Sequence, residues 1–163
     1  PYPLRVVYDA NVSKMEKIAG KLILTVPEGA DVLKREKTVT EWYRKEMKRI
    51  LETQIASCEK KTGICASEYK IRNMKTRWGT CNIGESSITL NLQLVKKPPQ
   101  CLEYVLIHEL VHLMERNHTN RFYALVEDFC PAWKETKKLL ESMPLDHIEK
   151  REHDTDGEKT DLE

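Results

Sequence analysis

Two histidines and a glutamate stand in the apolar stretch VLIHELVH, residues 105–112. Residues four apart lie on one face of an α-helix with about 6 Å of rise between them, so His108 and His112 can direct both imidazoles at one ion. Glu109 lies about 100° round the helix, where its carboxylate can address a water on the ion rather than the ion itself. The HExxH spacing therefore predicts a metal site with an acid–base group beside it.

A catalytic zinc site takes three protein ligands and leaves a fourth position for water. His118 is the predicted third ligand. It cannot continue the face of His112, because six residues correspond to a rotation of about 600°, so the chain must turn before it. Asn117 tolerates the left-handed conformation and is expected to end the helix. The alternative third ligands are Glu115, Glu127 and Asp128.

The donor set favours a catalytic rather than a structural site. A structural zinc site is closed by four ligands that commonly include cysteines, and no cysteine lies within this motif. Coordination can lower the pKa of water from about 15.7 to about 7, and Glu109 is predicted to accept the proton. Zn²⁺ is the expected ion, although three histidines also suit Ni²⁺, cobalt or iron.

Other side chains are predicted to support this chemistry. Arg77 and Tyr123 are candidates for stabilising the negative charge that develops on a substrate oxygen. The alternatives are a structural ion pair for Arg77 and simple packing for Tyr123. Trp78 and Gly79 are expected to shape the loop beside the site, and the alternative for Trp78 is simple core packing.

An alternating segment, residues 88–95, predicts one strand with apolar residues on one face. Asn91 and Gln93 fall on its polar face and are predicted to line the cleft. If this strand lies at the edge of a sheet, it can pair with an extended peptide through main-chain hydrogen bonds.

Basic residues crowd the approach to the RWGTC loop. They form either a solvated surface or a rim that attracts an anionic partner, such as nucleic acid or a nucleotide phosphate. No glycine-rich phosphate loop supports the nucleotide reading. The residues concerned are Lys70, Arg72, Lys75 and Arg77.

The elements that must position these residues read as α+β. Thr38 and Glu41 form a capping-box pattern before a predicted helix over 38–61. The β-branched runs predict strands, and residues 75–87 read as a loop. The predicted strands are 4–10, 21–27, 67–74 and 88–95, and the further helices are 100–116, 119–129 and 131–142, with Thr119 as an N-cap and Pro131 in a first turn.

Four segments resemble the YgjP-like family of predicted metal-dependent hydrolases, relatives of the WLM and SprT-like zinc peptidases. They are MKTRWGTC (74–81), ITLNLQLV (88–95), YVLIHELVHLMERNHTNRFYALV (104–126) and CPAWKETKKLL (130–140). The ligand spacing also matches the metzincins, but those carry a glycine where this chain has Glu115.

The resemblance covers about residues 20–142 and implies a zincin-like α+β fold. Together with the length of the chain it predicts a single domain over residues 1–143, with a catalytic core over 66–142. In it a small antiparallel or mixed sheet packs against the HExxH helix and further helices. The resemblance also implies that His108, His112 and His118 are zinc ligands and that Glu109 is the general base. Residues 144–163 are mostly charged and are predicted to be a solvated tail.

Bulk properties narrow the setting. The net charge of +1 gives no global field toward nucleic acid, and no apolar run approaches the roughly 18–20 residues that span a bilayer. Five cysteines, an odd number without a CxxC pair, indicate reduced thiols and predict a cytoplasmic location. The chain begins at Pro1 rather than methionine, which predicts an upstream segment.

Three functions are compatible with the sequence. The leading prediction is a zinc peptidase with a peptide or protein substrate and no membrane partner. The alternatives are a hydrolase of a non-peptide substrate, such as a nucleoside triphosphate, and a metal-stabilised binding module.

Overall fold

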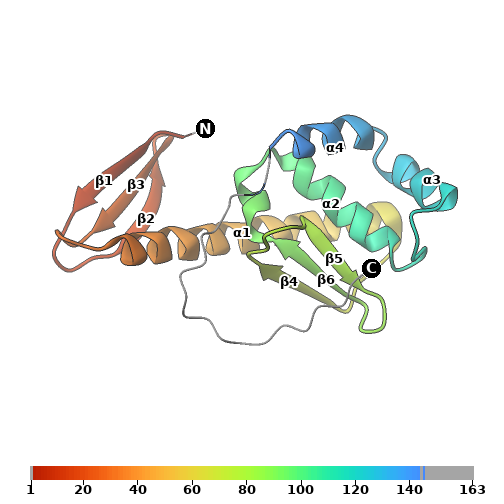
Figure 1. Cartoon of the computed structure of the whole chain (residues 1–163), viewed down its shortest axis with the longest axis horizontal. Coiled ribbons are helices and arrows are strands. Elements are labelled where there is room, and N and C mark those ends of the chain that lie inside the picture. Colours follow the sequence, from red (N-terminus) through yellow and green to blue (C-terminus); the bar gives the residue numbers. More distant parts are fainter. Residues whose placement is uncertain (1, 144, 146–163) are drawn as a thin grey trace.

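The computed structural model describes residues 2–143 and 145 of the 163-residue chain. The predicted charged tail, 144–163, lies outside these residues except for Leu145. The described residues form two three-stranded sheets and four α-helices (Figure 1), so the α+β prediction is confirmed. In chain order the elements are β1 (Leu4–Tyr8), β2 (Lys14–Ile18), β3 (Lys21–Val26), α1 (Val32–Thr62), β4 (Glu68–Arg72), β5 (Gly79–Asn82), β6 (Ser87–Asn91), the 3-10 helix η1 (Leu92–Lys96), α2 (Pro99–Val111), α3 (Asn120–Phe129) and α4 (Trp133–Glu141).

The first sheet has the order β1-β3-β2, with β1 parallel and β2 antiparallel to β3. Strand β2 was not predicted, because its residues KMEKI are mostly charged. Its turn into β3 uses Ala19 and Gly20, both at positive φ (46° and 73°). Two positive φ values in a two-residue hairpin are typical of a type I′ turn, which asparagine and glycine more often signal.

Helix α1 begins earlier than predicted. The side chain of Asp31 accepts a hydrogen bond from the Lys34 amide at 2.8 Å and caps the helix. The predicted cap, Thr38, is buried inside the helix and donates its hydroxyl to the Lys34 carbonyl, also at 2.8 Å. A capping box at Thr38 is therefore wrong. The predicted end, residue 61, lies one residue before the observed end at Thr62, where Gly63 follows with a left-handed φ of 70°.

The second sheet has the order β4-β6-β5, with β4 parallel and β5 antiparallel to the central β6. Strand β5 lies in the segment predicted as a loop. The predicted strand 88–95 is correct only to Asn91, because there the Asn91 side chain accepts from the Gln93 amide at 3.1 Å and begins η1. The edges of this sheet are β4 and β5.

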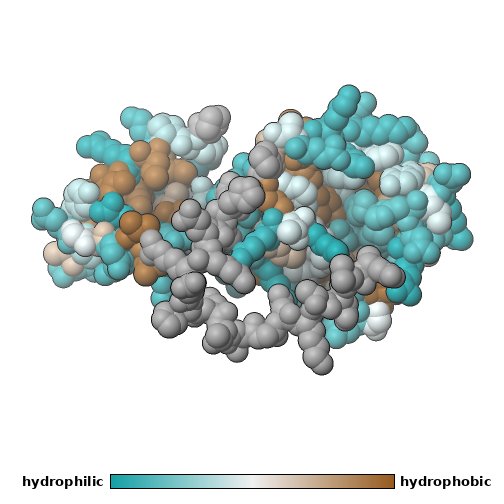
Figure 2. Space-filling model, viewed as in Figure 1, coloured by the Kyte–Doolittle hydropathy of each residue, from teal (hydrophilic) through white to brown (hydrophobic). Residues whose placement is uncertain are grey.

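Helix α2 supplies much of the main core, which also contains β6, α3, α4 and the C-terminal half of α1. A smaller cluster packs the first sheet against the start of α1 and consists of Met15, Leu22, Leu24 and Val26. Figures 1 and 2 show this sheet standing beside the N-terminal half of α1, with apolar side chains gathered there. No helix within the described residues is long and apolar enough to cross a bilayer.

Candidate metal centre

Helix α2 and the turn after it bring three imidazoles together. His108 lies in the last turn of α2, His112 immediately follows the helix, and His118 lies just before α3. One ligand nitrogen from each ring can be chosen so that all three lie within 4.8 Å of one another, and His108 Nε2 is 3.0 Å from His118 Nε2. Within the described residues, this is the one convergent group of three or more His, Cys, Asp or Glu ligands.

The turn that delivers His118 differs from the prediction. Helix α2 ends at Val111 rather than Arg116, and the His112 amide still donates to the His108 carbonyl at 3.3 Å. Asn117 is not left-handed, since Ala19 and Ser86 are the non-glycine residues at positive φ in the described chain. The chain therefore makes its turn over several residues instead of at one asparagine.

Thr119 fixes the other end of this turn. Its side chain accepts from the Phe122 amide at 3.2 Å, which confirms the predicted N-cap of α3. Helix α3 then ends at Phe129, as predicted, whereas α4 begins at Trp133, two residues after Pro131.

The alternative ligands lie outside the convergent group. Glu115 contributes its main chain, because its carbonyl lies 3.3 Å from His112 Nδ1. A carbonyl can only accept, so this contact places the proton on Nδ1 and leaves Nε2 free to bind a metal. Glu127 forms an ion pair with Lys134 at 3.4 Å, and Asp128 is exposed on α3.

A phenylalanine that the sequence analysis missed lies against all three imidazoles. The ring of Phe122 is fully buried, with centroids 4.8, 4.5 and 4.7 Å from those of His108, His112 and His118. It restricts how the rings can rotate. Its position four residues after His118, in the first turn of the next helix, was the available signal.

Tyr123 follows Phe122 on α3 and is half-buried. Its ring stacks on His118 at 6.0 Å and on Trp133 at 5.3 Å. It is therefore held between the third histidine and the start of α4.

Burial changes the protonation of the site. It lowers the pKa of His108 from 6.5 to about 3, with smaller effects from the charges of His112, His118 and Lys137, and it also lowers the pKa of His112. Both rings are thus neutral near pH 7, which is the form that binds a metal. The three-histidine set fits a divalent transition metal.

The carboxylate of Glu109 lies against bare backbone. The side chain is 7% exposed, and burial raises its pKa from 4.5 to about 8, partly opposed by the positive charge of Arg77. A Cβ on Gly79 would lie 2.7 Å from Glu109 Oε1 and 2.8 Å from Val105 Cγ1. Only glycine therefore lets the start of β5 approach the carboxylate this closely.

Asn91 does not line the site, which corrects the prediction. It is fully buried, and its side-chain amide donates to the carbonyls of Met74 (2.8 Å) and Arg77 (2.7 Å). It holds the loop that leads into β5. Gln93 is also buried. Because β6 is the central strand of its sheet, the prediction that a peptide pairs with this strand is wrong. The edge strand beside Glu109 is β5.

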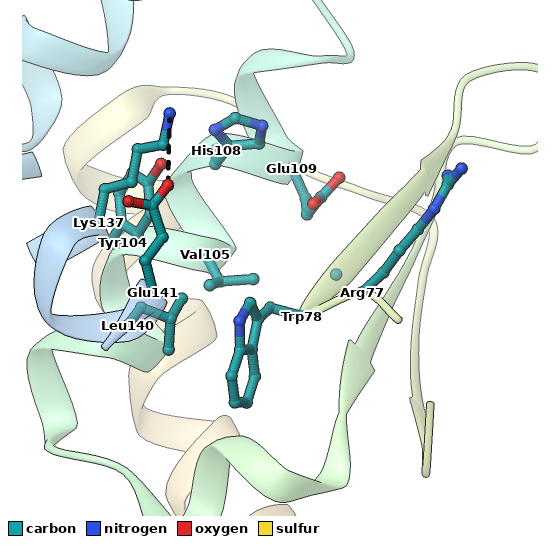
Figure 3. A pocket seen from close by; sticks show the side chains of 10 residues that line it. Arg77, Trp78, Tyr104, Val105, His108, Glu109, Lys137, Leu140 and Glu141 are labelled. Atoms are coloured by element: carbon teal, nitrogen blue, oxygen red, sulfur yellow. Dashed lines mark ion pairs between the residues drawn. The ribbon is translucent and has the colours of Figure 1, made fainter. Parts of the chain in front are cut away.

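A pocket of about 250 Å³ opens beside Glu109 (Figure 3). The loop before β5 supplies Arg77 and Trp78, helix α2 supplies its inner wall, and α4 closes the far side. A second hollow of about 500 Å³ lies along the other end of β5, between Cys81–Gly84 and Arg116. The lining of the first pocket is Arg77, Trp78, Gly79, Tyr104, Val105, His108, Glu109, Lys137, Leu140 and Glu141.

The basic residues of the approach lie on β4 and in the loop that follows it. Lys70 forms an ion pair with Glu68 at 2.9 Å, which reduces its field. Arg72, Lys75 and Arg77 are exposed at the end of β4 and in the loop that follows. An anionic partner there stays a prediction.

Similarity to known proteins agrees with this geometry. The solved structures that match include the metallopeptidase zymogen abylysin of Pyrococcus abyssi (23% identity, 57% of this chain, 94% of that chain, TM-score 0.52) and the metallopeptidase zymogen jannalysin of Methanocaldococcus jannaschii (19%, 57%, 96%, TM-score 0.50). At these identities the likeness shows the fold. No curated protein matches the chain. Residues 1–143 match the family described as the YgjP-like metallopeptidase domain. The fold and the three converging imidazoles beside a buried glutamate agree with this match. Because the match covers residues 1–143, the chain belongs to the YgjP-like metallopeptidase family.

Proposed function

We propose that this metallopeptidase is a zinc peptidase in which His108, His112 and His118 hold the ion and Glu109 is the general base. The convergence of three ligand nitrogens within 4.8 Å carries the proposal. Three protein ligands are the number that catalytic zinc sites use, whereas structural sites use four. The described residues offer no fourth member of the group, which disfavours a metal-stabilised binding module.

His108, His112 and His118 would hold the zinc ion, which when bound would supply Lewis acidity for activating a water and polarising a carbonyl. Glu109 would accept a proton from the attacking water and return it to the leaving amine. Its raised pKa describes the metal-free protein. A nearby divalent charge lowers the pKa of a carboxyl, so the loaded site holds Glu109 as the carboxylate that a general base requires.

The substrate peptide is proposed to lie along β5. This strand is an edge of its sheet and begins at Gly79, directly against Glu109. An extended peptide can add to such an edge through main-chain hydrogen bonds. Arg77, exposed beside the pocket, and Tyr123, stacked on His118, are the proposed donors to the developing oxyanion.

The test measures metal content and turnover on the same preparations. We expect about one zinc per chain, cleavage of casein-derived peptides and no cleavage of nucleoside triphosphates. Glu109→Gln should keep the metal and lose turnover, and His118→Ala should lose metal. Glu127→Gln is the matched control. Glu127 forms an ion pair with Lys134, so this substitution should leave metal content and turnover unchanged. Triphosphate cleavage that depends on Glu109 would contradict the proposal.

A further inference from the structure

We infer that the pocket beside Glu109 is the subsite for a substrate side chain next to the scissile bond, and that it selects an uncharged apolar side chain up to aromatic size. The inference rests on the proposed peptidase function and names the substrate feature that the site would recognise. His108 and Glu109 form part of the pocket lining. A substrate side chain that enters the pocket therefore belongs to a residue whose main chain lies close to the proposed reaction centre.

The walls are apolar and come from three separate elements. Trp78 precedes β5, Val105 lies on α2, and Leu140 lies on α4 (Figure 3). Tyr104, also on α2, is 6% exposed and packs edge-on against the His108 ring at 5.8 Å. Because burying a charge in such walls without a partner is costly, they favour an apolar occupant.

Two contacts help to fix the position of Trp78. Lys97 Nζ lies 5.5 Å from the centre of its indole, and Asn91 holds the carbonyl of the preceding residue, Arg77. A braced aromatic wall presents a flat surface, against which a substrate aromatic ring can stack.

The size of the pocket limits the occupant. Its volume is about 250 Å³. Pockets for drug-sized ligands measure about 300–1,000 Å³, so this one suits a single large side chain rather than a longer segment.

The rim carries two opposite charges that offset each other. Lys137 Nζ lies 3.9 Å from Glu141 Oε1, one turn further along α4, and both side chains are about half exposed. The dashed line in Figure 3 marks this pair beside His108. This pair therefore adds no net charge to the α4 side of the pocket, whose lining also includes Arg77, and removing one member should change the charge there.

The first experiment uses zinc-loaded wild-type protein and fluorogenic peptides. Each peptide carries Phe, Leu, Ala, Asp or Lys at the residue on either side of the scissile bond, which mass spectrometry locates. We expect kcat/KM to be at least about tenfold higher for Phe or Leu than for Asp or Lys at one of the two positions, as an apolar pocket discriminates.

Two rim variants then test the pocket itself, and both replace exposed residues that should not affect folding. Lys137→Ala leaves Glu141 unopposed and should raise the ratio of kcat/KM for Lys over Asp peptides about threefold or more. Glu141→Ala leaves Lys137 unopposed and should lower the same ratio. Lys138→Ala is the matched control, since Lys138 is exposed on α4 outside the pocket lining.

A third variant, Leu140→Phe, narrows the pocket and should reduce Phe cleavage more than Ala cleavage. The inference is overturned if cleavage shows no side-chain preference, or if the two rim variants shift the ratio as Lys138→Ala does. If zinc-loaded wild type cleaves no peptide at all, the proposed function fails as well. Cleavage without preference overturns the subsite alone.

Discussion

At the scale of single residues, Gly79 and Glu109 form a contact that joins distant parts of the chain. The helical spacing of His108, His112 and Glu109 was readable from the sequence, because helix geometry fixes it locally. The contact with Gly79 was not, because it depends on how the sheet packs on α2. For the same reason, Phe122 beneath the imidazoles was missed.

Adding one methyl group at Gly79 tests this contact. In Gly79→Ala, the new Cβ would lie within 2.8 Å of Glu109 and Val105 atoms, so something must move. We expect zinc content to be kept, stability to fall by about 1–3 kcal/mol, and peptide turnover to fall by about 10²-fold. Gly84→Ala is the control, because its nearest neighbour would be 3.6 Å away. Equal turnover in the two variants would contradict the argument.

The raised pKa of Glu109 makes the metal-free protein sensitive to alkali. With a pKa of about 8 when folded and 4.5 as its ordinary value, the group takes up a proton on folding between these pH values. Its contribution to the free energy of unfolding is fully present below pH 4.5 and is lost as the pH rises through about 8.

Comparing wild type with Glu109→Gln isolates this effect, because all other titrating groups are shared. With metal chelated, the free energy of unfolding of wild type should fall relative to that of the variant as the pH rises. The change in this difference between pH 4.5 and 9 should be about 4 kcal/mol. Denaturant titrations across this range measure it. A difference that stays constant with pH would argue against a buried, protonated Glu109.

At the scale of elements, Asn91 decides where β6 ends and where the next loop lies. The alternating pattern over 88–94 correctly predicted the start of this strand and its apolar face. It overran the end, because an asparagine side chain can replace strand pairing with a cap, and the pattern of hydrophobic residues does not register this. The start of α1 was misplaced in a similar way, since both Asp31 and Thr38 are acceptable caps.

Removing the Asn91 side chain should loosen the loop that carries Arg77 and Trp78. Asn91→Ala leaves the Arg77 carbonyl without the donor that Asn91 supplies, and it leaves the Met74 carbonyl with only the longer bond from Gln93 Nε2 (3.4 Å). We expect a loss of about 2–3 kcal/mol in the free energy of unfolding. Limited proteolysis within residues 73–78 should become faster. Asn82→Ala, which removes one exposed hydrogen bond to Glu85, is expected to cost less than about 1 kcal/mol. A similar cost for both would contradict this role.

At the scale of the whole molecule, two hydrophobic clusters share one long helix. The main core surrounds α2, and the smaller one lies between the first sheet and the start of α1. The sequence predicted β1 and β3 but not that their sheet has its own core, because β2 lacks an apolar pattern. The proposed metal centre depends on the main core.

Mutating each cluster separately should show this division. Met15→Ala should speed amide hydrogen exchange in β1–β3 while leaving α2 protection and zinc content unchanged. Leu106→Ala, in the main core, should lower the free energy of unfolding by about 3 kcal/mol and reduce protection of α2. If Met15→Ala exposed α2 to the same extent, the two clusters would form one cooperative unit.

The proposed ligands all come from one continuous stretch, His108 to His118, whereas the surroundings of Glu109 come from a remote strand. Grafted onto a foreign helical hairpin, that eleven-residue stretch should carry ion affinity with it. The graft should not hydrolyse peptides, because it would lack the glycine backbone of the remote strand against which the carboxylate packs.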